Sequence, residues 1–145
     1  MDLFQTANFK SHAGLDLTWK IEMDALSSTE WVTIKNMIME RAQPFRKAIG
    51  IPRGGVLLAD LMDLHSTNNE NDPICIVDDV LTTGTSFTDF VIDNSLLPRD
   101  YIGWCVFARA EPPAYVTALF QMPAVYDLKQ FNEDTYEYIY TNSGC

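Results

Sequence analysis

The sequence lacks a long apolar run. A helix that spans a bilayer needs about 20 consecutive apolar residues, and no stretch of this 145-residue chain supplies them. The first residues, MDLFQ, also lack the basic and then apolar pattern of a secretion signal. We therefore expect a cytoplasmic protein with no helix across a membrane.

Basic residues are also scarce. Lys and Arg number 10 against 20 Asp and Glu, which gives a formal net charge of −10. Because non-specific binding to nucleic acids relies on Lys and Arg that neutralise phosphates, this balance argues against a nucleic-acid partner. A chain this acidic can hold an anionic ligand only through locally placed cations or bound Mg2+.

Cysteines are few, and low-complexity segments, internal repeats and linkers are lacking. Cys75, Cys105 and Cys145 form an odd, widely spaced set, and two of them fall in apolar runs. We predict reduced core residues, not a disulfide framework or a zinc site. With 47% hydrophobic residues, the chain is predicted to form one domain over residues 1–145.

The most informative segment is ICIVDDVLTTGTS, residues 74–86. Its apolar part, residues 74–77, is short, rich in β-branched residues and preceded by Pro73, which is typical of a buried parallel strand. Two carboxylates, Asp78 and Asp79, follow it. Hydroxyls and a glycine come next, where a helix is expected to begin, from Thr82, Thr83, Gly84, Thr85 and Ser86.

This pattern suits a sugar phosphate. The first amides of a helix have no partner within the helix, so they can bind a phosphate. Adjacent carboxylates repel each other unless hydroxyls or a divalent cation use their oxygens, and a ribose offers paired hydroxyls. Ligands of open α/β sheets bind at the carboxyl ends of the strands. The alternative is a plain strand-to-helix connection in which the Asp and Thr residues only cap and turn.

A second glycine-containing turn lies upstream. A strand over residues 45–51 is followed by Pro52, Arg53, Gly54 and Gly55 and then by a helix over residues 56–64. The glycines permit close approach of a ligand to the backbone, and Arg53 offers paired donors to phosphate oxygens. Taken alone, this segment also fits an ordinary strand-helix unit.

The remaining pattern predicts an α/β fold with an open, mainly parallel sheet and helices on both faces. Alternation over residues 15–21 indicates a half-buried strand, and Ser27 with Glu30 has the spacing of a capping box for a helix that starts at Ser28 and ends before Pro44. We interpret His12 and Lys20 as solvated or capping residues. The other expected elements are a helix that ends near residue 95, a strand over 101–108, a helix over 114–120 and edge strands over 125–128 and 136–141.

The segment 74–86 resembles the phosphoribosyl pyrophosphate (PRPP) motif of the type I phosphoribosyltransferases. The resemblance implies that Asp78 and Asp79 meet the ribose hydroxyls and that residues 82–86 wrap the 5′-phosphate. Residues 50–55 resemble the pyrophosphate loop of the same family, which often holds a cis peptide ahead of its basic residue, here Pro52–Arg53. Arg53, Gly54 and Gly55 would then face the pyrophosphate.

Residues 9–14, FKSHAG, are similar to the amino-terminal region of orotate phosphoribosyltransferases, where a strand and turn form a hood over the base. This similarity divides the domain into a hood over residues 1–26 and a core over residues 45–128. His12 stands where that family has a base-contacting lysine. Arg109 follows the strand over residues 101–108, and the resemblance implies that it meets the carboxylate of the base together with Thr82. The alternative for Arg109 is an ion pair with Glu111.

The family implies binding of PRPP and an orotate-like nucleobase, a requirement for Mg2+, and a homodimer. It also implies phosphoribosyl transfer to or from a pyrimidine. One departure stands out, because residues 64–73 are short and polar where the family carries a long hairpin that closes over the pyrophosphate. An alternative is therefore a catalytically impaired regulatory protein that binds a ribose phosphate or nucleotide. In a third reading, a second subunit supplies the missing groups.

Overall fold

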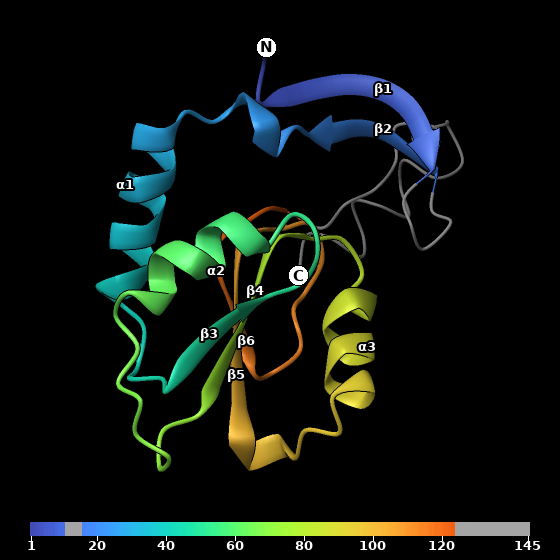
Figure 1. Cartoon of the computed structure of the whole chain (residues 1–145). Coiled ribbons are helices and arrows are strands. Elements are labelled where there is room, and N and C mark those ends of the chain that lie inside the picture. Colours follow the sequence, from blue (N-terminus) through green and yellow to red (C-terminus); the bar gives the residue numbers. More distant parts are fainter. Residues whose placement is uncertain (11–15, 124–145) are drawn as a thin grey trace.

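A computed structural model describes residues 1–10 and 16–123 of the chain (Figure 1). Four parallel strands form its central sheet in the order β3-β4-β5-β6. Their bounds are β3 (Lys47–Gly50), β4 (Ile74–Leu81), β5 (Tyr101–Ala108) and β6 (Val116–Gln121). The predicted open parallel sheet is confirmed.

Helices cover both faces of this sheet. Alternate residues of β4 divide between two core clusters, with Cys75 and Val77 in one and Ile74 and Ile76 in the other. The first cluster packs against α1 (Ser28–Met39) and α2 (Val56–Asp63), and the second packs against Phe87 of α3 (Thr85–Asp93). Figure 1 shows α1 and α2 on one side of the strands and α3 on the other.

The start of α1 follows directly from the sequence. Glu30 N–H donates to Ser27 Oγ at 3.2 Å, and Ser27 N–H donates to Glu30 Oε1 at 2.9 Å, so the predicted capping box is present. The hydrogen bond from Ser27 lowers the pKa of the Glu30 carboxyl. The helix ends at Met39, before the predicted boundary at Pro44.

A two-stranded antiparallel hairpin forms the amino-terminal hood. It consists of β1 (Phe4–Lys10) and β2 (Asp16–Ile21), with Phe4 opposite Ile21. The sequence predicted β2 but not β1. Phe4 attaches the hairpin to the sheet, since its ring centroid lies 5.8 Å from that of Phe107. In Figure 1 the hairpin lies above the carboxyl ends of the parallel strands.

One predicted helix is wrong. Residues 114–120 were expected to be helical after Pro112 and Pro113, but the chain turns there, with Val116 N–H donating to Pro113 O at 2.9 Å, and continues as β6. A short apolar segment suits either a helix or a strand by its own pattern. The edge of β5 decides between them, because it pairs with β6 from Gly103 opposite Val116 to Ala108 opposite Gln121.

Other boundaries differ less. The strand predicted over residues 74–77 continues as β4 to Leu81, so both carboxylates of the motif lie within the strand. The strand predicted over residues 45–51 is shorter, and α3 ends at Asp93 rather than near residue 95. Two short 3-10 helices, Met23–Ala25 and Pro98–Asp100, complete the described elements.

Cys75 and Cys105 are free thiols in the core, as predicted. Burial raises the pKa of each to about 12, so both are protonated and unreactive at neutral pH. Cys145, His12 and the edge strands predicted over 125–128 and 136–141 lie outside the described residues. Within the described part of the chain, no helix has the length and apolar character needed to cross a membrane.

Candidate functional site

A cleft of about 810 Å3 opens at the carboxyl ends of the parallel strands. It is lined by residues 20–22 at the end of the hairpin, residues 51–54 after β3, residues 78–87 and Asp89 from β4 into α3, and Arg109 after β5. Most of the residues proposed from the sequence therefore meet in one place. They are Arg53, Gly54, Asp78, Asp79, Thr82, Thr83, Gly84, Thr85, Ser86 and Arg109.

Asp78 and Asp79 lie side by side near the end of β4. The Asp78 side chain is 8% exposed, whereas Asp79 is half-buried. Each carboxylate accepts one backbone hydrogen bond. Asp79 N–H donates to Asp78 Oδ1 at 2.8 Å, and Val80 N–H donates to Asp79 Oδ1 at 2.7 Å. Burial first, and the neighbouring Asp79 second, raise the pKa of Asp78 to about 8. A hydroxyl donor or a cation in the cleft would favour its ionised form.

This raised pKa gives a testable pH dependence. In metal-free buffer, the unfolded chain loses the Asp78 proton at about pH 4, whereas the folded chain keeps it up to about pH 8. The folded state therefore binds more protons across that window, so its stability falls as pH rises. We expect the melting temperature to decrease between about pH 6 and about pH 8, by about 4 °C for each kcal/mol lost.

The matched variants are Asp78→Asn, which removes the titrating group, and Asp60→Asn, which changes an exposed residue of α2. Thermal unfolding across the same pH range checks the expectation. Asp78→Asn should flatten the decrease and Asp60→Asn should leave it unchanged. The same slope in wild type and Asp78→Asn would contradict the assignment.

The loop after β3 brings its backbone close to the carboxylates. The Pro52–Arg53 peptide is cis, as the family resemblance implied. A Cβ on Gly54 would overlap the Asp79 carboxylate, and a Cβ on Gly55 would overlap the carbonyl oxygen of Val77. Gly55 therefore requires glycine, because its neighbour is backbone, whereas a methyl group at Gly54 would displace the Asp79 side chain. Arg53 is exposed at the cleft, and Gly55 packs behind it and does not line the cleft.

Residues 82–86 turn the chain from β4 into α3. Gly84 caps the helix with a φ of +85°, a conformation that favours glycine. The first bond of the helix runs from Thr88 N–H to Gly84 O at 3.1 Å, so the amides of Ser86 and Phe87 precede it. Thr83 Oγ1 accepts Thr85 N–H at 3.3 Å and lies 2.8 Å from Thr85 Oγ1. Amides and hydroxyls thus gather on a single turn at the cleft.

Arg109 occupies the next strand end. Its backbone N–H donates to Leu81 O at 2.7 Å, which places the residue beside Thr82. The side chain is 2% exposed, and its Cζ lies 3.7 Å from the ring centroid of Trp19. Glu111, the alternative partner weighed from the sequence, is exposed. The guanidinium therefore lies between the hairpin and the cleft.

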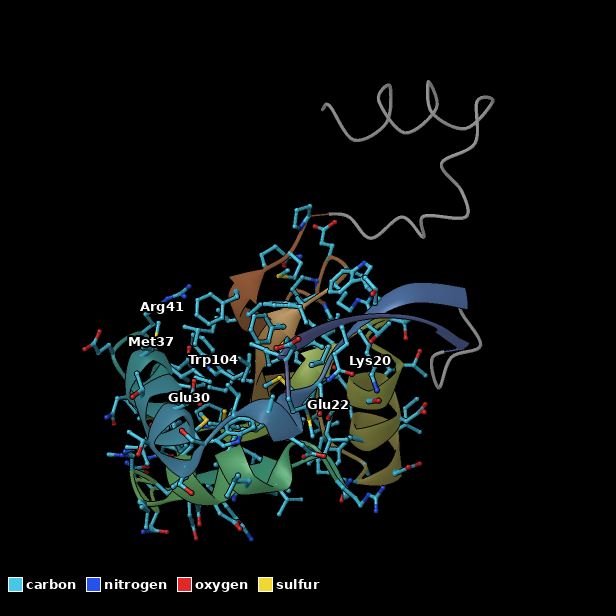
Figure 2. All side chains as sticks on the ribbon, turned by 90° about the horizontal axis from the view of Figure 1, so that it is seen from above. Lys20, Glu22, Glu30, Met37, Arg41 and Trp104 are labelled. Carbon is cyan, nitrogen blue, oxygen red and sulfur yellow. The ribbon has the colours of Figure 1, made fainter. Side chains whose placement is uncertain are left out.

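The hairpin side of the site was not predicted from the sequence. Lys20 was interpreted as a solvated or capping residue, but it lines the cleft with Glu22, and its Nζ lies 3.3 Å from Glu22 Oε2 (Figure 2). Trp19, which stacks on Arg109, was counted only as part of an apolar strand face. The alternation of β2 carried no signal for either role, because both depend on where the hairpin packs.

Residues 64–73 form no hairpin, as the sequence indicated. Thr67 N–H donates to Phe45 O at 2.9 Å, and Thr67 Oγ1 donates to Asp72 Oδ2 at 2.6 Å. These bonds hold the segment at the amino end of the sheet, away from the cleft. His65, in the same segment, lies near α1, with its Nε2 3.0 Å from Lys35 Nζ.

The described residues also limit the kind of metal site. Within residues 1–10 and 16–123, no group of three or more His, Cys, Asp or Glu side chains could hold a metal ion by itself. Asp78 and Asp79 are the two adjacent carboxylates of the cleft. A cation bound there would need further oxygens from a ligand or from water.

No protein-family model and no curated protein matches the sequence. Solved structures do match. The orotate phosphoribosyltransferase from Aeropyrum pernix is 17% identical with a TM-score of 0.64, over 82% of this chain and 88% of that one. Leishmania donovani UMP synthase is 12% identical with a TM-score of 0.60, over 83% of this chain and 33% of that one. The orotate phosphoribosyltransferase from Francisella tularensis is 12% identical with a TM-score of 0.55, over 97% and 86%. At these identities the likeness establishes the fold.

Proposed function

We propose, from the type I phosphoribosyltransferase fold of this chain, that its cleft binds PRPP and transfers phosphoribosyl to or from a pyrimidine base such as orotate. One observation carries the proposal. Residues 51–54 and residues 78–86 lie far apart in the sequence, yet they line one cleft together with Arg109. A sugar, a 5′-phosphate, a pyrophosphate and an anionic base need just such a set of neighbouring subsites.

The 5′-phosphate is assigned to the turn over residues 82–86. The amides of Ser86 and Phe87 and the hydroxyls of Thr83 and Thr85 offer donors to its oxygens. The amino end of α3 adds a favourable dipole for negative charge. No lysine is needed at this position, since the backbone supplies the donors.

The ribose is assigned to Asp78 and Asp79. Ionised carboxylates accept hydrogen bonds from sugar hydroxyls, and such bonds to charged groups are stronger than neutral ones. Binding would ionise Asp78, because a hydroxyl donor favours the charged form of a carboxyl whose pKa burial has raised. Phosphoribosyl binding should therefore release a proton below about pH 8.

The pyrophosphate is assigned to Arg53 and the backbone at Gly54, which lies against the Asp79 carboxylate. The residues present fit a Mg2+ ion, because this ion is usually held by one or two carboxylates together with substrate phosphates. Bound there, Mg2+ would neutralise charge on the departing pyrophosphate. Arg53 supplies a second positive charge at the same place.

The reaction needs no covalent residue of the protein. The anomeric carbon gains positive character as pyrophosphate departs, so the chain contributes position and charge. Asp78 and Asp79 hold the ribose, residues 82–86 hold its phosphate, and Arg109 with Thr82 orients the carboxylate of the base. His12, which the family resemblance places on the base side, lies outside the described residues.

Gly54→Ala should separate ligand binding from folding. Its added methyl group would displace the Asp79 side chain, so we expect PRPP affinity to fall at least about tenfold, as when one hydrogen bond to a charged group is lost. The melting temperature should change little. Gly55→Ala is the contrast, because its methyl group would meet the Val77 carbonyl and cost about 1–3 kcal/mol of stability. Calorimetry and thermal unfolding measure both, and unchanged affinity in Gly54→Ala would contradict the site.

A second candidate is a regulatory protein that binds the same ligand without turnover. Residues 64–73 favour it, because they are held at the amino end of the sheet and cannot cover the pyrophosphate from there. In a homodimer, catalysis would be retained if the second subunit supplied the groups that cover the pyrophosphate. The mass of the protein in solution tests the proposed dimer.

Two measurements distinguish the candidates. Calorimetry with PRPP in Mg2+ tests binding, and an orotate consumption assay then tests turnover. Binding followed by consumption supports the transferase. Binding without consumption supports the regulatory protein, and the absence of PRPP binding refutes both.

A further inference from the structure

The hairpin and the base side of the cleft meet at one contact. The Arg109 guanidinium lies over the Trp19 ring, with 3.7 Å between Cζ and the ring centroid. Trp19 belongs to β2, whereas Arg109 follows β5 in the parallel sheet. The contact therefore connects two parts of the molecule that share no strand pairing.

Stacking fixes the direction of the guanidinium. A planar guanidinium that lies flat on an aromatic face presents its N–H groups at the edge of the stack. Arg109 also lines the cleft, although it is only 2% exposed. Trp19 covers one face of the Arg109 side chain. The Arg109 backbone is fixed by the 2.7 Å hydrogen bond from its N–H to Leu81 O. A long side chain is thus held in one orientation before any ligand arrives.

We propose that Trp19 is a positioning residue for Arg109 and thereby sets the preference of the cleft for a carboxylated base over the same base without a carboxylate. The inference rests on the proposed function, since Arg109 is the group that would read the carboxylate. A bidentate contact between guanidinium and carboxylate requires a defined plane. Trp19 defines that plane from outside the cleft, which it does not itself line.

A purely structural role makes a different prediction. Trp19 also contacts Phe4, with 6.4 Å between ring centroids, so its loss could simply loosen the hairpin. Phe4 attaches the hairpin to the sheet independently, through Phe107 at 5.8 Å. A change at Phe4 therefore weakens hairpin packing without touching the guanidinium, which makes Phe4→Leu the matched control.

The test compares two nucleotides that differ only in the base carboxylate: the 5′-monophosphate of orotidine and that of uridine. Calorimetry in Mg2+ without pyrophosphate gives a dissociation constant for each and avoids turnover. The readout is the ratio of the two dissociation constants, in which the contribution of the shared sugar phosphate cancels. The variants are Trp19→Leu, Trp19→Phe and Phe4→Leu, with Trp19→Met in place of Trp19→Leu if that variant does not fold.

Wild type should prefer the carboxylated nucleotide. Trp19→Leu should reduce this preference about 30-fold, the scale of a desolvated cation–π contact, mainly by weakening the binding of the carboxylated ligand. Trp19→Phe, which keeps an aromatic face, and Phe4→Leu should both retain it.

Two outcomes would overturn the inference alone. An unchanged ratio in Trp19→Leu means that Arg109 needs no support from the ring. Equal reductions in Trp19→Leu and Phe4→Leu mean that hairpin packing explains the effect. The proposed function fails separately and visibly, if wild type binds neither nucleotide. Equal affinity of wild type for both nucleotides would remove the role of Arg109 and the inference with it.

Discussion

Asp78→Asn combined with Asp79→Asn should abolish PRPP binding and leave the fold intact. Each carboxylate offers charged acceptor oxygens to the ribose, and hydrogen bonds to charged groups are worth about 1.5–3 kcal/mol each, so losing two should cost at least about 100-fold in affinity. An amide keeps the shape of the side chain but loses its charge. Because Asp78 is buried and costly to ionise, the double variant should be at least as stable as wild type at neutral pH.

The control for this variant carries the same change in formal net charge elsewhere. Asp60→Asn with Glu70→Gln alters two exposed residues that do not line the cleft. Calorimetry with PRPP in Mg2+ measures all three proteins, and thermal unfolding verifies that each is folded. PRPP affinity retained by the Asp78 and Asp79 variant would place the ribose somewhere else.

Arg109→Ala should weaken the base far more than the sugar phosphate. Removing a buried guanidinium that meets a carboxylate should cost about 2–3 kcal/mol, because the partner charge then lacks its donor. PRPP itself makes no contact with Arg109 in the proposed arrangement. Its affinity should therefore stay near the wild-type value while that of the orotate nucleotide falls by about 30- to 150-fold.

Arg41→Ala is a suitable control, since it removes another arginine that makes a cation–π contact with a tryptophan. Its Cζ lies 5.5 Å from the ring centroid of Trp104, beside α1 and outside the cleft (Figure 2). Calorimetry with PRPP and with the orotate nucleotide gives both affinities for each variant. Equal losses for the two ligands in Arg109→Ala would exclude the orotate assignment, while a selective loss would support it.

Local signals in the sequence predicted much of the fold. Ser27 and Glu30 satisfy each other over one helical turn, so their spacing alone located the start of α1. The apolar runs that became β4 and β5 were recognisable because strands covered on both faces contain few polar residues. Since parallel strands end at one edge of a sheet, the motif residues after them were expected to meet, and they do.

The features that the sequence did not predict all depend on contacts between residues far apart in the sequence. Residues 116–121 form a strand because the edge of β5 accepts them, and their own pattern left that undecided. β1 was missed because it is stabilised by pairing with β2 and by the contact of Phe4 with Phe107. The roles of Trp19 and Lys20 at the cleft arise only once the hairpin lies above the strand ends.

The departure at residues 64–73 was visible in the sequence as a missing segment. The structure adds where the short segment lies: Thr67 binds the carbonyl of Phe45 at the amino end of the sheet. The residues that line the cleft are therefore separate from whatever covers it in this chain. In the proposed function, ligand binding depends on residues 51–54 and 78–86, which line the cleft, and turnover would depend on what shields the pyrophosphate from water.

A crystal structure with PRPP and Mg2+ bound tests the central claim most directly. We expect the 5′-phosphate within hydrogen-bonding distance of the amides of Ser86 and Phe87, and the ribose hydroxyls on Asp78 and Asp79. The Thr83 and Thr85 hydroxyls should turn toward the phosphate. A ligand bound outside this cleft, or amides at residues 82–87 that remain bonded to the protein's own atoms, would contradict the account.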